Sequence, residues 1–218
     1  LTANQKVSLN SVTSGDINVN NQINGKNITI QTANGKIESN AAGTLTATAE
    51  SGTITVGATQ GNIVLGGAAT ADQKVKIGAT AGSVSLNGAV ESVAGEVEVT
   101  AKEAVTSSAA LNAKTNVKIT SQVNSAVLND TVTAETGDVT VNASTGISVA
   151  KAIQAGTNVA LSSTNGDVTT GEKVKATTGD VNVTTGTGNI SVQAVEADKD
   201  ISLTTTAGNI TSSGVLTD

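Results

Sequence analysis

The sequence predicts an all-β protein, a right-handed parallel β-helix (β-solenoid) of about ten triangular rungs with about 21 residues each. Three observations predict this fold. Apolar and polar residues alternate in short runs, the runs recur at a nearly constant spacing, and aromatic residues are absent. Alternation with a period of two places one face of a strand in a core. A core without aromatic side chains must be narrow and regular, because those side chains normally fill much of the buried space.

A first strand opens each rung with an apolar-x-apolar pair. The pairs are Val7 and Leu9, Ile28 and Ile30, Ile54 and Val56, Val75 and Ile77, Val97 and Val99, Val117 and Ile119, Val139 and Val141, Val159 and Leu161, Val181 and Val183, and Ile201 and Leu203. The seven pairs from Val75 to Leu203 are the predicted structural core. A polar residue between the two members of each pair is expected to face outward.

A second and a third strand complete each rung. The second strands are expected at Ile17, Ile37, Ile63, Val84, Val105, Val127, Ile147, Val168, Ile190 and Ile210, and the third strands recur every 21 residues from Ala69 to Leu216. Gly-Asp, Gly-Asn and Asn-Gly pairs mark turns between strands. Each strand should pair in parallel with its equivalent about 4.8 Å away in the next rung, and the general preference of parallel crossovers predicts a right-handed coil.

Two departures from strict repetition are visible. The first-strand spacing widens to 26 residues between Ile28 and Ile54, which predicts an enlarged corner or bulge near residues 39–52. This segment is either a tolerated insertion or a binding loop. The residues before the first strand also repeat every 42 positions, as in Gly95, Gly137 and Gly179, so the duplicated unit is predicted to be two rungs. Residues 1–218 are interpreted as one solenoid domain and as an internal fragment of a longer fibre.

Composition argues against several classes of function. The net charge is −6 and no basic stripe is present, which argues against binding of nucleic acid. No apolar run approaches the roughly 20 residues of a membrane-spanning helix, so no membrane insertion is expected. Because His, Cys, Arg and Tyr are missing, catalytic triads, zinc sites and imidazole acid–base chemistry have no residues to use. We therefore expect no enzymatic activity, no catalytic residues and no cofactor.

The remaining charged residues are Lys, Asp and Glu. Asp180, Asp198 and Asp200 form the best acidic cluster and are weak candidates for a metal site, although a solvated corner is the favoured interpretation. Outward residues of successive rungs lie within reach of one another. Lys76, Glu98 and Lys118 alternate in sign along one such column, and Lys175 lies between Gln154 and Glu196 in another. We interpret both columns as solvated, mutually compatible faces.

The repeated units resemble those of a known group of proteins. Gly137-Asp138-Val139-Thr140-Val141 and Gly188-Asn189-Ile190-Ser191-Val192 are similar to the repeats of filamentous haemagglutinin-like exoproteins and related giant β-strand-repeat bacterial surface proteins. This resemblance covers essentially the whole chain. It implies export across a Gram-negative envelope and an extracellular location at the bacterial cell surface.

The expected function is that of a structural shaft or filament in an extracellular fibre that supports adhesion or cell–cell contact. An open parallel edge at each end invites pairing, so the expected partner is the chain itself, through end-to-end stacking or continuation of the same chain. The alternative is an adhesin module that binds polysaccharide or another surface, such as that of a neighbouring cell, through outward Asn and Thr ladders. The absence of an aromatic platform for sugar rings argues against the alternative.

Overall fold

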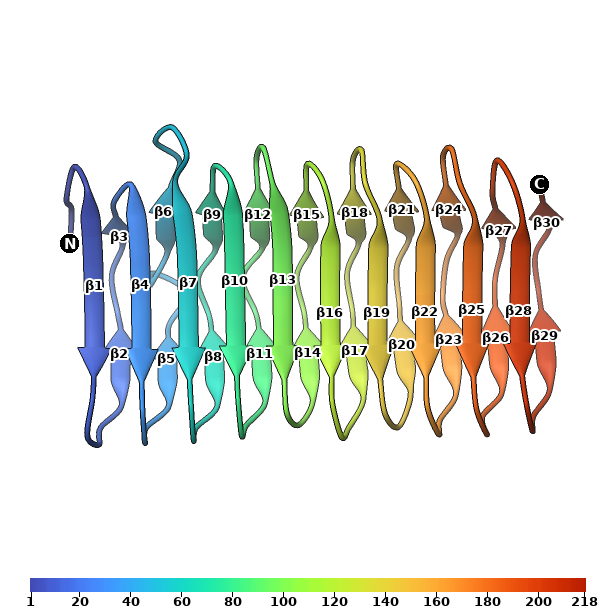
Figure 1. Ribbon diagram of the computed structural model, residues 1–218, viewed down its shortest axis with the longest axis horizontal. Coiled ribbons are helices and arrows are strands. Elements are labelled where there is room, and N and C mark those ends of the chain that lie inside the picture. The colour runs from blue at the N-terminus through green and yellow to red at the C-terminus, as the bar shows by residue number, and fades with distance from the viewer.

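The computed structural model describes all residues from 1 to 218 and contains thirty strands in three parallel ten-stranded sheets (Figure 1). The first sheet consists of β1 (Lys6–Ser11), β4 (Asn27–Thr32), β7 (Thr53–Ala58), β10 (Lys74–Ala79), β13 (Glu96–Ala101), β16 (Val117–Ser121), β19 (Val139–Ala143), β22 (Val159–Ser163), β25 (Val181–Thr185) and β28 (Ile201–Thr205). The second consists of β2 (Ile17–Val19), β5 (Ile37–Ser39), β8 (Ile63–Leu65), β11 (Val84–Leu86), β14 (Val105–Ser107), β17 (Ala126–Leu128), β20 (Ile147–Val149), β23 (Val168–Thr170), β26 (Ile190–Val192) and β29 (Ile210–Ser212). The third consists of β3 (Ile23–Asn24), β6 (Leu45–Ala47), β9 (Ala69–Ala71), β12 (Val90–Ser92), β15 (Leu111–Ala113), β18 (Val132–Ala134), β21 (Ile153–Ala155), β24 (Val174–Ala176), β27 (Val195–Glu196) and β30 (Leu216–Thr217).

Each strand pairs in parallel with the strand three places further along the chain, which confirms the predicted β-solenoid. In Figure 1 the nearer strands of the first sheet run downward and the other two sheets lie behind them, while the chain advances from left to right. This is the sense of a right-handed coil. No helix is present that could cross a membrane.

The core is a single cluster of 51 buried residues, all of them Val, Ile, Leu or Ala. Register places each inward residue of the first sheet directly on its equivalent in the next rung. Twelve of the fourteen predicted core residues are fully buried in this cluster: Val75, Ile77, Val97, Val99, Val117, Ile119, Val139, Val141, Val159, Leu161, Val181 and Val183.

The core prediction is wrong for the last pair. Ile201 and Leu203 are only partly buried, because they lie in the last rung, where no further rung covers them. In the same rung Ile210 and Leu216 are exposed. At this end of the rod, burial of a column therefore falls off where no further rung lies against it.

The strand predicted at Val127 is confirmed, but Val127 itself faces outward in it. Ala126 pairs with Val105 and Ile147 and is buried, whereas Val127 pairs with outward residues and is only partly buried. The run Ala126-Val127-Leu128 is apolar throughout, so alternation cannot identify its inward face. The register from the neighbouring rungs decides it.

Buried polar groups are few and of one kind. The eight buried polar residues are all Ser or Thr, and several occupy inward positions where a strand ends. The Thr185 hydroxyl, for example, donates to the carbonyl oxygen of Gly166 at 2.7 Å and accepts the N–H of Gly188. Thr32 and Ser92 likewise bond backbone groups of two adjacent rungs, and the other buried hydroxyls have at least one backbone partner, as buried polar atoms require.

The predicted enlargement near residues 39–52 is divided between two corners. Ile37 and Leu45 are eight residues apart, against six for Ile63 and Ala69 in the next rung. Leu45 and Thr53 are also eight apart, against five for Ala69 and Lys74, so the five extra residues split as two and three. The second of these loops projects beyond the other turns above β7 in Figure 1.

The enlarged corners are tied to the chain around them. Ser51 has a positive φ of 61°, and its N–H donates to the Asp72 carboxylate at 2.8 Å. The Asn40 side chain accepts the N–H groups of Ala42 and Gly43. Strand pairing on both sides stays in register, which favours the interpretation as a tolerated insertion.

The 42-residue period has a steric cause. Val139 lies five positions after Ala134, at the end of the preceding strand, whereas Val159 lies only four positions after Ala155. A Cβ at Gly137 would lie 2.4 Å from Oδ1 of Asn116, one rung earlier, and a Cβ at Gly179 would lie 2.3 Å from Oδ1 of Asn158. The longer corner therefore leaves no room for a Cβ at Gly137 or Gly179, and at Gly95 the obstacle is the backbone oxygen of Gln73, so Gly recurs there while two corner types alternate.

A polar side chain in an aliphatic column should be far more damaging than the same side chain facing outward. Val139→Asn leaves an unpaired amide in the core and should lower the free energy of unfolding by about 3 kcal/mol or more. Thr140→Asn, on the outward face of the same strand, should change it by less than about 0.5 kcal/mol. Urea denaturation followed by circular dichroism measures both, and equal effects would contradict the assignment of the two faces.

Candidate functional site

The corner that leads into the first sheet carries a ladder of side chains that serves the fold. We call Asn116, Asp138, Asn158, Asp180 and Asp200 the Asn/Asp ladder. Oδ1 of each of the first four members accepts the backbone N–H of the next member, at 2.9, 2.9, 2.9 and 3.1 Å in chain order. Each of these side chains therefore satisfies one backbone donor in the adjacent rung.

Asp138 is the most heavily used member of this ladder. Partial burial raises the pKa of its carboxyl group, but hydrogen bonds from the Thr157 hydroxyl and from the backbone and side-chain N–H groups of Asn158 outweigh burial. The net result is a pKa below the ordinary value for Asp. The carboxylate form is thus the one that the corner binds.

The three aspartates proposed as weak metal candidates do not converge on a site. Asp180 is occupied in the Asn/Asp ladder, where it accepts the N–H of Asp200, and the carboxylates of Asp198 and Asp200 face solvent. No group of three or more His, Cys, Asp or Glu residues in the chain is arranged to hold a metal ion. In the structure these three residues lie at a corner of the rod that is at least partly open to solvent.

Ion pairs run along the rod between neighbouring rungs. Seven of the eight salt bridges join a Lys to a Glu in the following rung, and the remaining one, between Lys36 and Glu38, lies within one rung. Lys76 and Glu98 form the predicted pair at 3.3 Å, but Glu98 also contacts Lys74 at 2.8 Å, and Lys118 joins no ion pair. The hydrogen bond from Lys74 is the main cause of a lowered pKa at Glu98.

A second cluster of this kind surrounds Glu196. Its carboxylate contacts Lys173 at 2.8 Å and Lys175 at 2.5 Å. Hydrogen bonds from Lys173 and then Lys175 lower the pKa of Glu196 to about 2. Exposed pairs contribute little to stability because water and salt screen them, so their clearest effect is to keep outward columns free of like-charge repulsion.

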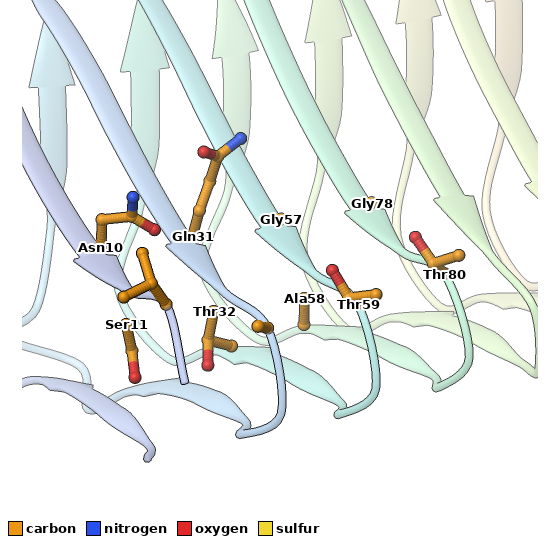
Figure 2. Close-up of a pocket in the computed structure, with 11 residues that line it drawn as sticks. Asn10, Ser11, Gln31, Thr32, Gly57, Ala58, Thr59, Gly78 and Thr80 are labelled. Atoms are coloured by element: carbon orange, nitrogen blue, oxygen red, sulfur yellow. The ribbon is translucent and has the colours of Figure 1, made fainter. Parts of the chain in front are cut away.

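The opposite end of the first sheet carries a hollow that the fold does not use. It has a volume of about 370 Å³ and lies where β1, β4, β7 and β10 end (Figure 2). Gly57 and Gly78 form its floor, Asn10 and Gln31 extend beside it from the neighbouring strands, and Thr59 and Thr80 follow in the turns. We call this hollow the glycine groove.

No side chain that lines the glycine groove carries a charge. Further outward hollows of about 310 and 290 Å³ continue along the rod, the first sharing Gly78 and Thr80 with the glycine groove and the second sharing Gln122 with the first. The column that contains Gly57 and Gly78 is uncharged in all ten rungs: Asn10, Gln31, Gly57, Gly78, Thr100, Thr120, Asn142, Ser162, Thr184 and Thr204. The result is a neutral, hydrogen-bonding strip along a chain that is otherwise acidic.

The glycine groove was not predicted from the sequence. A signal was present, because Val56-Gly57-Ala58 and Ile77-Gly78-Ala79 place Gly inside two successive first strands. Gly in a strand interior often marks a bulge or a close approach. Only the register shows that the two glycines are adjacent and face outward.

Comparison of the chain with protein-family models, with curated proteins and with solved structures returned no significant match. The likeness to filamentous haemagglutinin-like proteins therefore remains a resemblance of the repeated units. Evidence on the function of the chain therefore comes from the side chains on the surface of the rod.

Asp138→Ala should destabilise the chain, because it removes the acceptor for the N–H of Asn158 and for the Thr157 hydroxyl. A loss of about 1–3 kcal/mol in the free energy of unfolding is expected near neutral pH. The folded pKa lies below the unfolded value of about 3.9, so this stabilisation is present above that pH and is lost as the pH falls through the folded pKa. Urea denaturation at pH 7 and pH 2 measures it. Asp198→Ala, which removes no hydrogen bond, is the control, and an equal loss in both variants would contradict the role of Asp138.

Glu196 should regain an ordinary pKa when its cations are removed. In the double variant Lys173→Met with Lys175→Met we expect its pKa to rise from about 2 towards about 4.3. Carboxyl ¹³C shifts measured by NMR across the acid range follow this titration. The folded pKa is depressed, so any stability from the cluster is present above the unfolded pKa and disappears as the pH falls towards the folded one. Lys118→Met should leave the Glu196 titration unchanged, and an unaltered pKa in the double variant would refute the assignment.

Proposed function

We propose that the chain is the structural shaft of an extracellular fibre at a bacterial cell surface, where it supports adhesion or cell–cell contact. The observation that carries this proposal is the uninterrupted register of three parallel sheets through all ten rungs. At about 4.8 Å per rung the rod is about 50 Å long. In such a rod, stability is approximately a sum of rung and interface contributions and increases with rung number. The architecture therefore suits a stiff spacer.

The last rung supports end-to-end association or continuation of the solenoid. Ile201, Leu203, Ile210 and Leu216 form an apolar hollow of about 440 Å³ bounded by Asp200 and Asp218. Strands β28, β29 and β30 each have one unpaired edge beside it, and such edges pair readily with further strands. A further rung, from the same chain or a second copy, would cover these apolar side chains and satisfy the edge.

The chemistry of the side chains supports a mechanical role over an enzymatic one. The groups that could transfer protons near neutral pH are confined to Asp, Glu and Lys. The perturbed carboxylates, at Asp138, Glu98 and Glu196, all have lowered pKa values, whereas a general acid or base needs a pKa near the working pH. A second candidate function, a polysaccharide-binding module, is favoured by the glycine groove.

Electron microscopy of the chain tests the shaft proposal. We expect rods that lengthen with protein concentration beyond about 50 Å and show an axial repeat of about 4.8 Å. Ile210→Lys, which places a charge on the exposed apolar end, should shorten them, whereas Thr106→Lys, on an outward face in the middle of the rod, should not. Antibodies against the chain should also label intact cells that produce it. Labelling only after cell lysis would contradict the proposed location.

A further inference from the structure

Gly57 and Gly78 occupy positions where the fold does not require glycine. Neither has a positive φ. A Cβ at Gly78 would meet no atom within 4 Å, and one at Gly57 would lie in ordinary contact, 3.8 Å from Cγ of Gln31. Glycine inside a strand is destabilising because of its conformational entropy, and other rungs place Thr, Asn or Ser in this column. The two glycines thus weaken the strands without any local structural benefit.

The polar side chains around the glycine groove are equally unused by the fold. Asn10, Gln31, Thr59 and Thr80 are exposed, and their side chains make no hydrogen bond within the chain. The Asn/Asp ladder at the other end of the same sheet is the opposite case, since its first four members all bind backbone N–H groups. The corner beside the glycine groove therefore has free donors and acceptors next to the backbone of Gly57 and Gly78, which no side chain covers (Figure 2).

We propose that the glycine groove binds a neutral polysaccharide chain lying along the solenoid axis. Amides and hydroxyls at its sides offer neutral donors and acceptors to sugar hydroxyls. The exposed peptide floor over Gly57 and Gly78 admits the flat face of a sugar ring where any side chain would exclude it, in line with the meaning of glycine within strands. Since no charged side chain lines the hollow, anionic glycans and phosphates find no counter-charge there.

The direction of the bound chain follows from the register. Asn10, Gln31, Gly57 and Gly78 succeed one another along the axis, one per rung. Successive rungs are about 4.8 Å apart, which is close to the length of one sugar unit in an extended polymer. Two further outward hollows continue the path as far as Thr164, and the first of them is also bordered by Lys76 and Glu98. A single hollow binds weakly, but several in line, or many shafts in parallel, raise the avidity.

Gly78→Thr separates binding from folding. The new Cβ meets no atom of the protein within 4 Å and Thr has a high preference for strands, so the variant should fold at least as stably as the natural chain, as judged by its urea midpoint. It should nevertheless fill the glycine groove. Ala160→Thr introduces the same side chain at an outward position of the same sheet, in β22, and is the matched control.

The measurement is the change in amide ¹H–¹⁵N shifts of the full chain during titration with soluble hexasaccharides. The neutral probes are cellohexaose, xylohexaose and mannohexaose, and oligogalacturonate is the charged probe. We expect at least one neutral probe to shift the amides of Gly57, Gly78 and Thr80 with a Kd below about 10 mM. Binding should be insensitive to added NaCl, because exposed ionic contacts alone would weaken with salt. Gly78→Thr should weaken it at least about tenfold, and Ala160→Thr should leave it unchanged.

Four results would overturn the proposal. These are no shift with any neutral probe, equal affinity in folded Gly78→Thr, stronger and salt-sensitive binding of oligogalacturonate, or concentration-dependent self-association through the glycine groove that Gly78→Thr abolishes. The last would assign the groove to a second copy of the chain. The first three results do not bear on rod assembly, and the fourth concerns a side face of the rod, so end-to-end assembly at the last rung is tested separately by Ile210→Lys.

Discussion

Parallel, in-register stacking is the constraint on which the rest of the structure depends. Every residue in a strand lies directly against its equivalent in the rungs before and after it, so each position must be compatible with repetition of itself. Aliphatic side chains meet this condition in the core, where the columns through Val75 and Ile77 run from rung to rung. The chain contains no aromatic residue, so every core column is built from Val, Ile, Leu and Ala.

The corners meet the same constraint with polar groups. A stacked corner brings backbone N–H and carbonyl groups of neighbouring rungs together without a regular ladder, and an unpaired buried group is costly. The Asn/Asp ladder and buried hydroxyls such as that of Thr185 provide partners across rungs. Charged columns also remain compatible with stacking, because a Lys in one rung forms an ion pair with a Glu in the next.

The proposed functions rest on two sets of residues, those that stacking requires and those that make no contact needed for stacking. The core columns and the Asn/Asp ladder are what stacking requires, and they account for a continuous rod. The glycine groove is the exception, since its glycines lower strand stability and its polar side chains are not bonded within the chain. A shaft that also holds neutral polysaccharide along its length would combine a mechanical role with contact to a surface or matrix.

Sequence alone determined the solenoid, its three strands per rung and twelve residues of its core in the first sheet, because a period of two within a period of about 21 permits few other folds. It also located the enlarged corner, since an insertion must interrupt the spacing. Tertiary structure decided the inward face at Ala126 and Val127, where alternation fails, and the partial exposure of Ile201 and Leu203. It also decided the roles of Asp180 and Gly78, because both depend on which residue lies one rung away. Register and corner length together determine which residues become neighbours in adjacent rungs.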